Sequence, residues 1–224
     1  MKDPIPCIVL LALLVQACSK RESAKPADPG YEYFPDRVGA WVEYQVDSAW
    51  RDDTFNVDET KSYRLRQVVA SHYTDPGGRP SMRIERFILQ PDGEWQIRDV
   101  WTATRTTTGL EMTEEDIRRL KISFPVREGR TWDTNSLSPE PELLVAARDV
   151  DEPYQLSGHN FEKTMAVRTT VPPNFVLTRD LEERYALGVG MIEHHWFFRE
   201  ADSVGPNVPE RSVRFDMVMV AYGN

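Results

Sequence analysis

Cysteine is almost absent from this chain of 224 residues, which contains only Cys7 and Cys18. Because both lie within the first 18 residues, no internal disulfide can staple the rest of the chain. Serine motifs are absent too: neither G-x-S-x-G nor S-x-x-K occurs in the sequence. These gaps argue against cysteine hydrolases, serine-elbow hydrolases and β-lactamase-like enzymes.

Positive charge is also in short supply, since 27 Lys and Arg stand against 36 Asp and Glu for a formal net charge of −9. Such a surface repels nucleic acid rather than attracting it. We therefore expect no nucleic-acid partner.

Histidine is scarce, with four in the chain, and its densest group is Glu193-His194-His195. On a strand, His194 and His195 point to opposite faces, so one metal ion cannot easily take both. No calcium loop of the D-x-D-x-D-G form is present either. The sequence predicts no metal site and no cofactor.

An apolar run, I-V-L-L-A-L-L-V-Q-A-C, occupies residues 8–18 and follows a positive charge at Lys2. This order is typical of a secretory signal, and V-Q-A-C resembles the lipobox of bacterial lipoproteins. We expect residues 1–17 to be a signal peptide cleaved between Ala17 and Cys18, and Cys18 to carry the fatty acyl chains, palmitate among them. The alternatives are a signal cut elsewhere and a membrane-spanning anchor, for which the run is shorter than the about 20 residues needed.

Residues 18–30 are small, charged and punctuated by proline, which predicts a flexible tether between the bilayer and a folded domain. Resemblance to the lipoproteins also implies a destination. Because Ser19 rather than aspartate follows the cysteine, we expect a lipid-anchored protein of the cell envelope, at the outer membrane and facing the periplasm.

Alternation of apolar and polar residues dominates the rest of the chain and is typical of strands with one buried face. It is clear in residues 41–50, 62–73, 94–101, 161–171 and 211–222. One wet face indicates antiparallel pairing. Asp75-Pro76-Gly77-Gly78 and Pro91-Asp92-Gly93 are hairpin turns by composition.

One segment, residues 113–120, has the features of a helix: Thr113 as a cap, acidic residues in its first turn and basic residues in its last. The predicted fold is therefore all-β, a curved antiparallel sheet or barrel-like meander of about ten strands with one short helix. Residues 31–224 should form a single domain.

Two segments repeat the pattern F-P-x-R-x-G with a tryptophan after it, one beginning at Phe34 and the other at Phe124. The domain is thus a candidate for two related halves, although two copies are fewer than the three a stacked array normally needs.

Three motifs together resemble a group of predicted β-rich lipoproteins of Gram-negative bacteria. They are F-P-x-x-V-G-x-W-x-E-Y from Phe34, F-P-x-x-x-G-x-x-W-D from Phe124, and Y-A-x-G-V-G-M-I from Tyr185. The resemblance implies envelope location and β architecture. It implies no activity and supplies no catalytic residues.

Aromatic residues exceed what turns require, and a curved sheet can enclose either its own core or a cavity. A candidate ligand or partner surface consists of Trp95, Trp101, Trp196, Phe197 and Phe198.

We interpret the protein as a membrane-anchored envelope lipoprotein that acts as a non-catalytic binding or accessory module. Its expected partners are the lipid bilayer, through acylated Cys18, and either an envelope protein or a hydrophobic ligand. One alternative is a carrier of a lipid or other hydrophobic ligand in a barrel-like cavity. The other is a hydrolase with an unrecognised carboxylate pair, for which neighbouring acids such as Glu182 and Glu183 are available.

Overall fold

The computed structural model describes residues 28–205 and 208–224. The predicted signal peptide (1–17), the cleavage and lipidation site at Ala17 and Cys18, and most of the predicted tether (18–30) lie outside the described residues. The elements, in chain order, are the short 3-10 helix η1 (Tyr31–Tyr33) and strands β1 (Trp41–Asp52), β2 (Val57–Thr74), β3 (Pro80–Leu89), β4 (Trp95–Arg105), β5 (Gly109–Glu114), β6 (Ile117–Ser123), β7 (Thr131–Asp133), β8 (Leu144–Leu156), β9 (His159–Thr169), β10 (Leu177–Ala186), β11 (Gly190–Ala201) and β12 (Glu210–Gly223).

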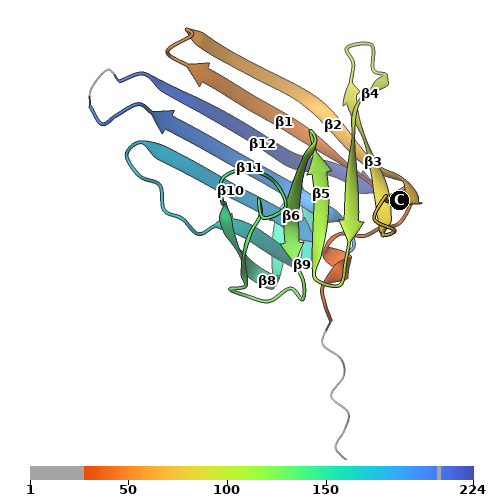
Figure 1. The fold of residues 1–224 in the computed structure, drawn as a ribbon. Helices are drawn as coiled ribbons and strands as arrows, with labels where there is room; N and C mark the ends of the chain where they lie inside the picture. The colour runs from red at the N-terminus through yellow and green to blue at the C-terminus, as the bar shows by residue number, and fades with distance from the viewer. Residues whose placement is uncertain (1–27, 206–207) are drawn as a thin grey trace, which may run out of the picture.

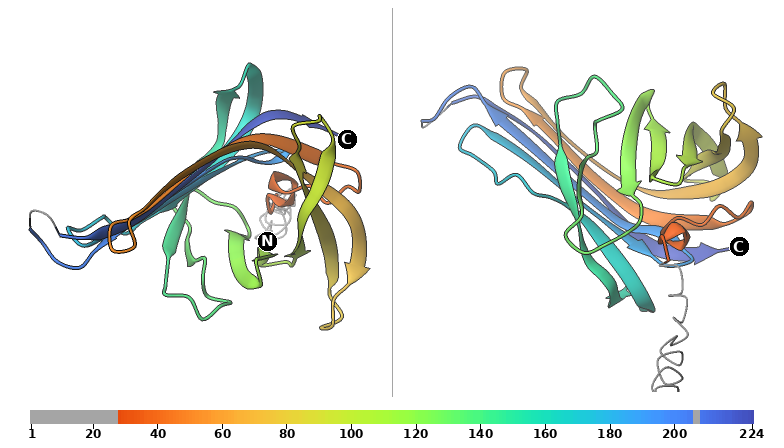
Figure 2. Two further views of the ribbon diagram at one scale, coloured as in Figure 1. Left: turned by 90° about the horizontal axis from the view of Figure 1, so that it is seen from above. Right: turned by 60° about the horizontal axis from the view of Figure 1, so that its bottom comes forward.

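The twelve strands form one antiparallel sheet in the order β6-β5-β4-β3-β2-β1-β12-β11-β10-β9-β8-β7. Strands that follow one another in the sequence therefore pair, except β6 and β7, and β1 pairs with β12. The two ends of the sheet, β6 and β7, come together where the Leu120 amide donates to the Thr134 carbonyl at 2.9 Å and the Trp132 indole donates to the Leu120 carbonyl at 2.9 Å. The result is a nearly closed barrel-shaped sheet (Figures 1 and 2), which confirms the predicted all-β class.

The helix predicted over residues 113–120 is wrong. That segment contains the end of β5, a tight turn at Glu115 and Asp116, and the start of β6. Both turn residues have positive φ, 49° and 66°, as a two-residue hairpin requires. Local cap and charge signals favoured a helix, but pairing of β5 with β4 and β6 satisfies the backbone and buries Leu110 and Met112, so tertiary context overrides propensity.

Alternation correctly places Val42, Tyr44 and Val46 on the buried face of β1. It fails at Trp50, which is 46% exposed. The reason is visible in Figure 2, where the far ends of β1, β2 and β10–β12 run on past the closed part of the barrel and have nothing packed over them.

The segment containing η1 lies inside the ring of strands (Figure 2). Its Tyr31 ring meets Phe124 edge-on with centroids 4.9 Å apart, and the Val126 amide donates to the Pro29 carbonyl at 2.9 Å. The two F-P segments therefore lie together near one end of the barrel. A common origin of the two halves stays a prediction. No helix within the described ranges is long and apolar enough to cross a membrane.

Candidate functional site

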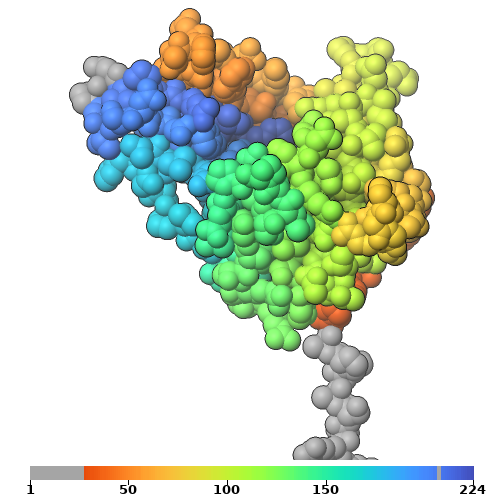
Figure 3. All heavy atoms as spheres, viewed as in Figure 1, coloured from red at the N-terminus to blue at the C-terminus, as the bar shows by residue number. Residues whose placement is uncertain are grey.

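A cleft of about 490 Å³ opens into the barrel between β10–β11 and the loop that follows β7. In Figure 3 the surface is hollowed at this place, between the green loop of residues 134–142 and the cyan segment before β10. Small-molecule sites in proteins commonly have volumes of about 300 to 1,000 Å³. We call this space the interior cleft.

One wall of the interior cleft follows directly from strand register. Four cross-strand pairs of β10 and β11 line it in order from the floor to the mouth: Glu183 with His194, Leu181 with Trp196, Arg179 with Phe198, and Leu177 with Glu200. Since side chains on one face recur every second residue, these pairs form successive rows. The wall is thus polar at the floor, apolar in the middle and charged toward the mouth.

The floor is built around the carboxylate of Glu183, whose side chain is 1% exposed. It forms an ion pair with Lys121 of β6 and accepts a hydrogen bond from the Tyr185 hydroxyl at 2.6 Å. The Tyr185 hydroxyl donates to Oε2, whereas the His194 Nδ1 lies 3.0 Å from Oε1, the oxygen that Lys121 also contacts. Lys121 also contacts Glu114 at 3.0 Å, so two carboxylates share one ammonium group. Every oxygen of the buried acid is satisfied.

These contacts shift the pKa values of the buried groups. Burial by itself raises the pKa of Glu183, but attraction by Lys121 and the hydrogen bond with His194 outweigh it and hold the pKa well below the usual range. For Lys121 burial lowers the pKa, and Glu114 and Glu183 more than compensate, so the net shift is upward. The pair is therefore charged across the physiological range.

His194 has one ring nitrogen left over. Glu183 occupies Nδ1, whereas Nε2 has no hydrogen-bond partner among the described residues and is not among the fully enclosed polar atoms. The His194 side chain is 18% exposed and lines the cleft. Nε2 is therefore available to a ligand group that reaches the floor.

Toward the mouth, Arg179 differs from the other cations of the cleft. Lys121 pairs with Glu114 and Glu183, Arg119 with Glu114, and Arg211 with Glu200. Within the described part of the chain, the Arg179 guanidinium contacts only the carbonyl oxygen of Glu142, at 3.2 Å. It retains donors and an uncompensated charge.

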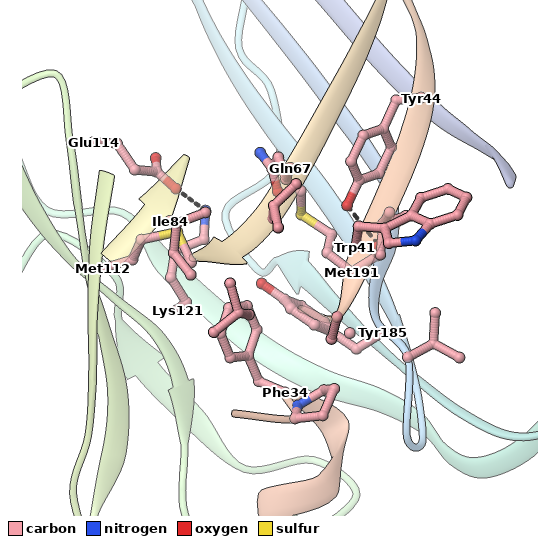
Figure 4. Close-up of a pocket in the computed structure, with 17 residues that line it drawn as sticks. Phe34, Trp41, Tyr44, Gln67, Ile84, Met112, Glu114, Lys121, Tyr185 and Met191 are labelled. Atoms are coloured by element: carbon pink, nitrogen blue, oxygen red, sulfur yellow. Dashed lines mark hydrogen bonds and ion pairs between the residues drawn. The ribbon is translucent and has the colours of Figure 1, made fainter. Parts of the chain in front are cut away.

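A second space lies on the other side of Lys121 and Glu114, toward η1. Figure 4 shows Phe34, Tyr44 and Tyr185 around it. Its volume is about 40 Å³, far below the roughly 300 Å³ at which small-molecule sites commonly begin. This smaller cavity has the size of a water site.

The five aromatic residues predicted as one surface are divided by the structure. Trp196 and Phe198 both line the interior cleft, as adjacent members of one face of β11. Phe197 projects from the other face and is 37% exposed. Trp95 is covered by the Arg66 guanidinium, 4.2 Å from its ring, and Trp101 is half-buried beneath Arg86 at 3.6 Å.

His194 and His195 point to opposite faces, as predicted. His195 lies on the outer face of β11, where its Nδ1 is 2.8 Å from an Asp216 oxygen and its Nε2 is 3.7 Å from a Glu193 oxygen. The carboxylates of Glu193 and Asp216 raise the pKa of His195 to about 9. In the described ranges, no three or more His, Cys, Asp or Glu side chains are grouped to hold a metal ion.

Sequence reasoning missed Lys121 and Arg179. Both are cations within alternating strands, where charged residues normally face water. The sequence gives no signal for Lys121, because it lies at a β-bulge: Leu110 pairs with Ile122 and Glu111 with Leu120, which leaves Lys121 between the two pairs. The sequence gives no signal for Arg179 either. Its availability to a ligand depends on the lack of a carboxylate beside it in the described structure, which only the fold shows.

Comparison with known proteins gives little further guidance. No family model matches the sequence, and no curated protein matches it. Two solved structures are similar in part. One, a candidate lipoprotein from Parabacteroides distasonis, has a TM-score of 0.41 and 11% identity, over 88% of this chain and 100% of that one. The other, a candidate exported protein with a YmcC-like fold from Bacteroides fragilis, has a TM-score of 0.41 and 10% identity, over 85% and 98%. Likeness at this level carries no conclusion about function.

Proposed function

We propose that this protein is a lipid-anchored envelope lipoprotein whose β domain is a non-catalytic binding module, with the interior cleft as its ligand site. The anchor rests on the lipobox-like sequence ending at Cys18. The binding role rests on one observation, a cleft of about 490 Å³ with an apolar middle and a polar floor whose carboxylate, Glu183, is satisfied. That combination suits a small molecule that is largely hydrophobic.

The arrangement of the carboxylates supports binding over hydrolysis. A glycosidase-like pair needs one acid that holds a proton and one that is ionised. Here Glu114 and Glu183 both contact Lys121, and the pKa of Glu183 is lowered. An acid with a lowered pKa, such as Glu183, does not hold the proton that a general acid must donate.

Native mass spectrometry of the acylated protein, purified from cell envelopes, tests the binding role. We expect a stoichiometric, non-covalent small molecule on the wild type. Leu181→Trp should expel it, because the larger ring fills the apolar row opposite Trp196. Leu187→Trp is the matched control, since Leu187 lies in the exposed β10–β11 turn. Identical spectra for all three proteins would overturn the proposal.

Labelling with radioactive palmitate tests the anchor separately. Wild type should incorporate label and Cys18→Ser should not. Equal incorporation by both would remove the lipoprotein assignment and leave the binding site untouched.

A second candidate function is suggested by the loops at the far ends of the long strands. Phe55, between β1 and β2, is 76% exposed, and Phe175, between β9 and β10, is 82% exposed. Exposed aromatic side chains of this kind are used in protein contacts. We propose this end as a docking surface for an envelope protein, to be tested by photo-crosslinking from position 55 in intact cells. Absence of any crosslink that Phe55→Ser abolishes would contradict it.

A further inference from the structure

The interior cleft holds its chemical groups at fixed separations, because they stand on two paired strands. Glu183 and Arg179 are on the same face of β10, four residues apart, and His194 and Phe198 are the matching positions on β11. At roughly 3.4 Å per residue, Arg179 and the His194 row are about 14 Å apart along the strands. Leu181 and Trp196 fill the row between them.

The two ends of this series of paired side chains differ in the groups they present to a ligand. Arg179 presents unpaired guanidinium donors and a positive charge toward the mouth, whereas every other cation of the cleft already contacts a carboxylate. Guanidinium groups bind carboxylates in pairs of parallel hydrogen bonds. At the floor, the His194 Nε2 is a single unpartnered polar atom.

The row between the ends is mostly apolar. Leu181 presents hydrocarbon there and Trp196 its indole ring, whose N–H is the only polar group of the two side chains, and Leu143, just before β8, also lines the cleft. A charged group placed in this row would lose its water and find at most one donor, at a cost of about 1–3 kcal/mol. The row therefore favours a ligand with an apolar middle.

We propose that the interior cleft binds a medium-chain carboxylate lengthwise, with its carboxylate on Arg179, its hydrocarbon chain along Leu181 and Trp196, and a terminal hydroxyl at His194 Nε2. This ligand class rests on the proposed function of the cleft as a binding site. A chain about as long as that of ω-hydroxylaurate fits the separation of about 14 Å. One arginine charge matches the single charge of a carboxylate.

Isothermal titration calorimetry on the full-length acylated protein in nanodiscs, with empty nanodiscs subtracted, tests the carboxylate end. Laurate should bind at least tenfold more tightly than lauryl alcohol, since a charge-assisted hydrogen bond contributes roughly a factor of ten or more. Arg179→Gln should abolish that preference and leave lauryl alcohol unchanged. Arg199→Gln removes the same charge from the outer face, where Arg199 pairs with Glu210, and should change neither.

Failure of the inference and failure of the proposed function give different results. Equal affinity of wild type for laurate and lauryl alcohol overturns the carboxylate assignment while the cleft remains a binding site. No binding of either compound, with no difference between wild type and Leu181→Trp, overturns the proposed function itself.

The far end is tested with two substitutions of His194. Asparagine can still donate to Glu183 in place of Nδ1 but has nothing at the position of Nε2, whereas glutamine places its amide near Nε2. Wild type should bind ω-hydroxylaurate several-fold more tightly than laurate. His194→Asn should erase the difference and His194→Gln should retain part of it. An unchanged ratio in His194→Asn would exclude a contact at Nε2.

Discussion

Lys121 and Glu183 form a buried ion pair across the inside of the barrel, although they lie 62 residues apart in the sequence. Their strands, β6 and β10, are not neighbours in the sheet. The pair therefore joins two distant parts of one continuous sheet and at the same time forms the floor of the interior cleft. It contributes both to holding the barrel together and to the shape of the site.

Removing the ammonium group should be costly because it leaves buried carboxylates uncompensated. We expect Lys121→Met to lower the free energy of unfolding by about 3–5 kcal/mol, measured by urea denaturation. Adding Glu183→Gln, which keeps the shape and removes the charge, should recover about 1–3 kcal/mol of that loss. If the double variant is as unstable as the sum of the single variants, the two residues are not coupled.

The turn between β5 and β6 offers a gain in stability. Asp116 has φ of 66°, a conformation that costs a residue with a side chain about 1–2 kcal/mol and costs glycine little. Asp116→Gly should therefore raise the free energy of unfolding by up to about 1 kcal/mol, the greater freedom of glycine in the unfolded chain offsetting part of the gain. Arg118→Gly, two residues later in β6, is the control and should be destabilising. A fall in stability with Asp116→Gly would contradict the turn geometry.

That same turn shows why part of the fold escapes sequence reasoning. The strands with a repeating apolar face, such as β1 and β12, could be predicted because period-2 alternation and hairpin turns are local signals. Residues 113–120 combine a cap residue with a helix-like charge order, and only pairing with β4 decides in favour of strands. Long-range pairing of this kind leaves no mark in a window of eight residues.

The candidate site was predictable to a smaller degree. The opposite orientation of His194 and His195 follows from strand geometry alone. Which residues of β10 and β11 stand opposite each other, such as Leu181 and Trp196, depends on the register of the two strands. That register shifts by one residue between Arg184 and Tyr185. The sequence shows glycines near this bulge but does not fix the shift, so it could not show that Glu183 stands opposite His194.

His195 should make stability depend on pH in the alkaline range. Its pKa is about 9 in the folded protein, above the ordinary value of 6.5, because Glu193 and Asp216 favour the charged ring. The stabilisation it contributes is complete below about pH 6.5 and is lost as pH rises through about 9. Thermal unfolding between these limits should show a falling melting temperature for wild type and a flatter profile for His195→Gln. Nuclear magnetic resonance of the ring protons reads the pKa directly, and a midpoint near 6.5 would contradict the charge arrangement.

The seam between β6 and β7 should be the least secure part of the barrel wall, because these strands are the two ends of the sheet. Two hydrogen bonds at Leu120 bridge it, together with side-chain hydrogen bonds from Arg119 to Asn135 and from Arg130 to Ser123. Trp132→Phe keeps the ring in place and removes the indole donor to the Leu120 carbonyl. We expect a loss of about 1–3 kcal/mol in the free energy of unfolding. The Leu120 amide, which donates across the seam to Thr134, should exchange its hydrogen faster.

Trp101 provides the matched control for this change. Its indole nitrogen is buried and has no hydrogen-bond partner in the described structure, so Trp101→Phe removes a similar volume and no hydrogen bond. The difference between the two variants in free energy of unfolding separates the loss of the seam hydrogen bond from the loss of packing when an indole is replaced by a phenyl ring. If Trp101→Phe accelerates exchange at Leu120 as much as Trp132→Phe does, the hydrogen bond does not hold the seam. If only Trp132→Phe does so, the seam opens independently of the rest of the wall, and ligand entry to the interior cleft beside it should become faster in the same variant.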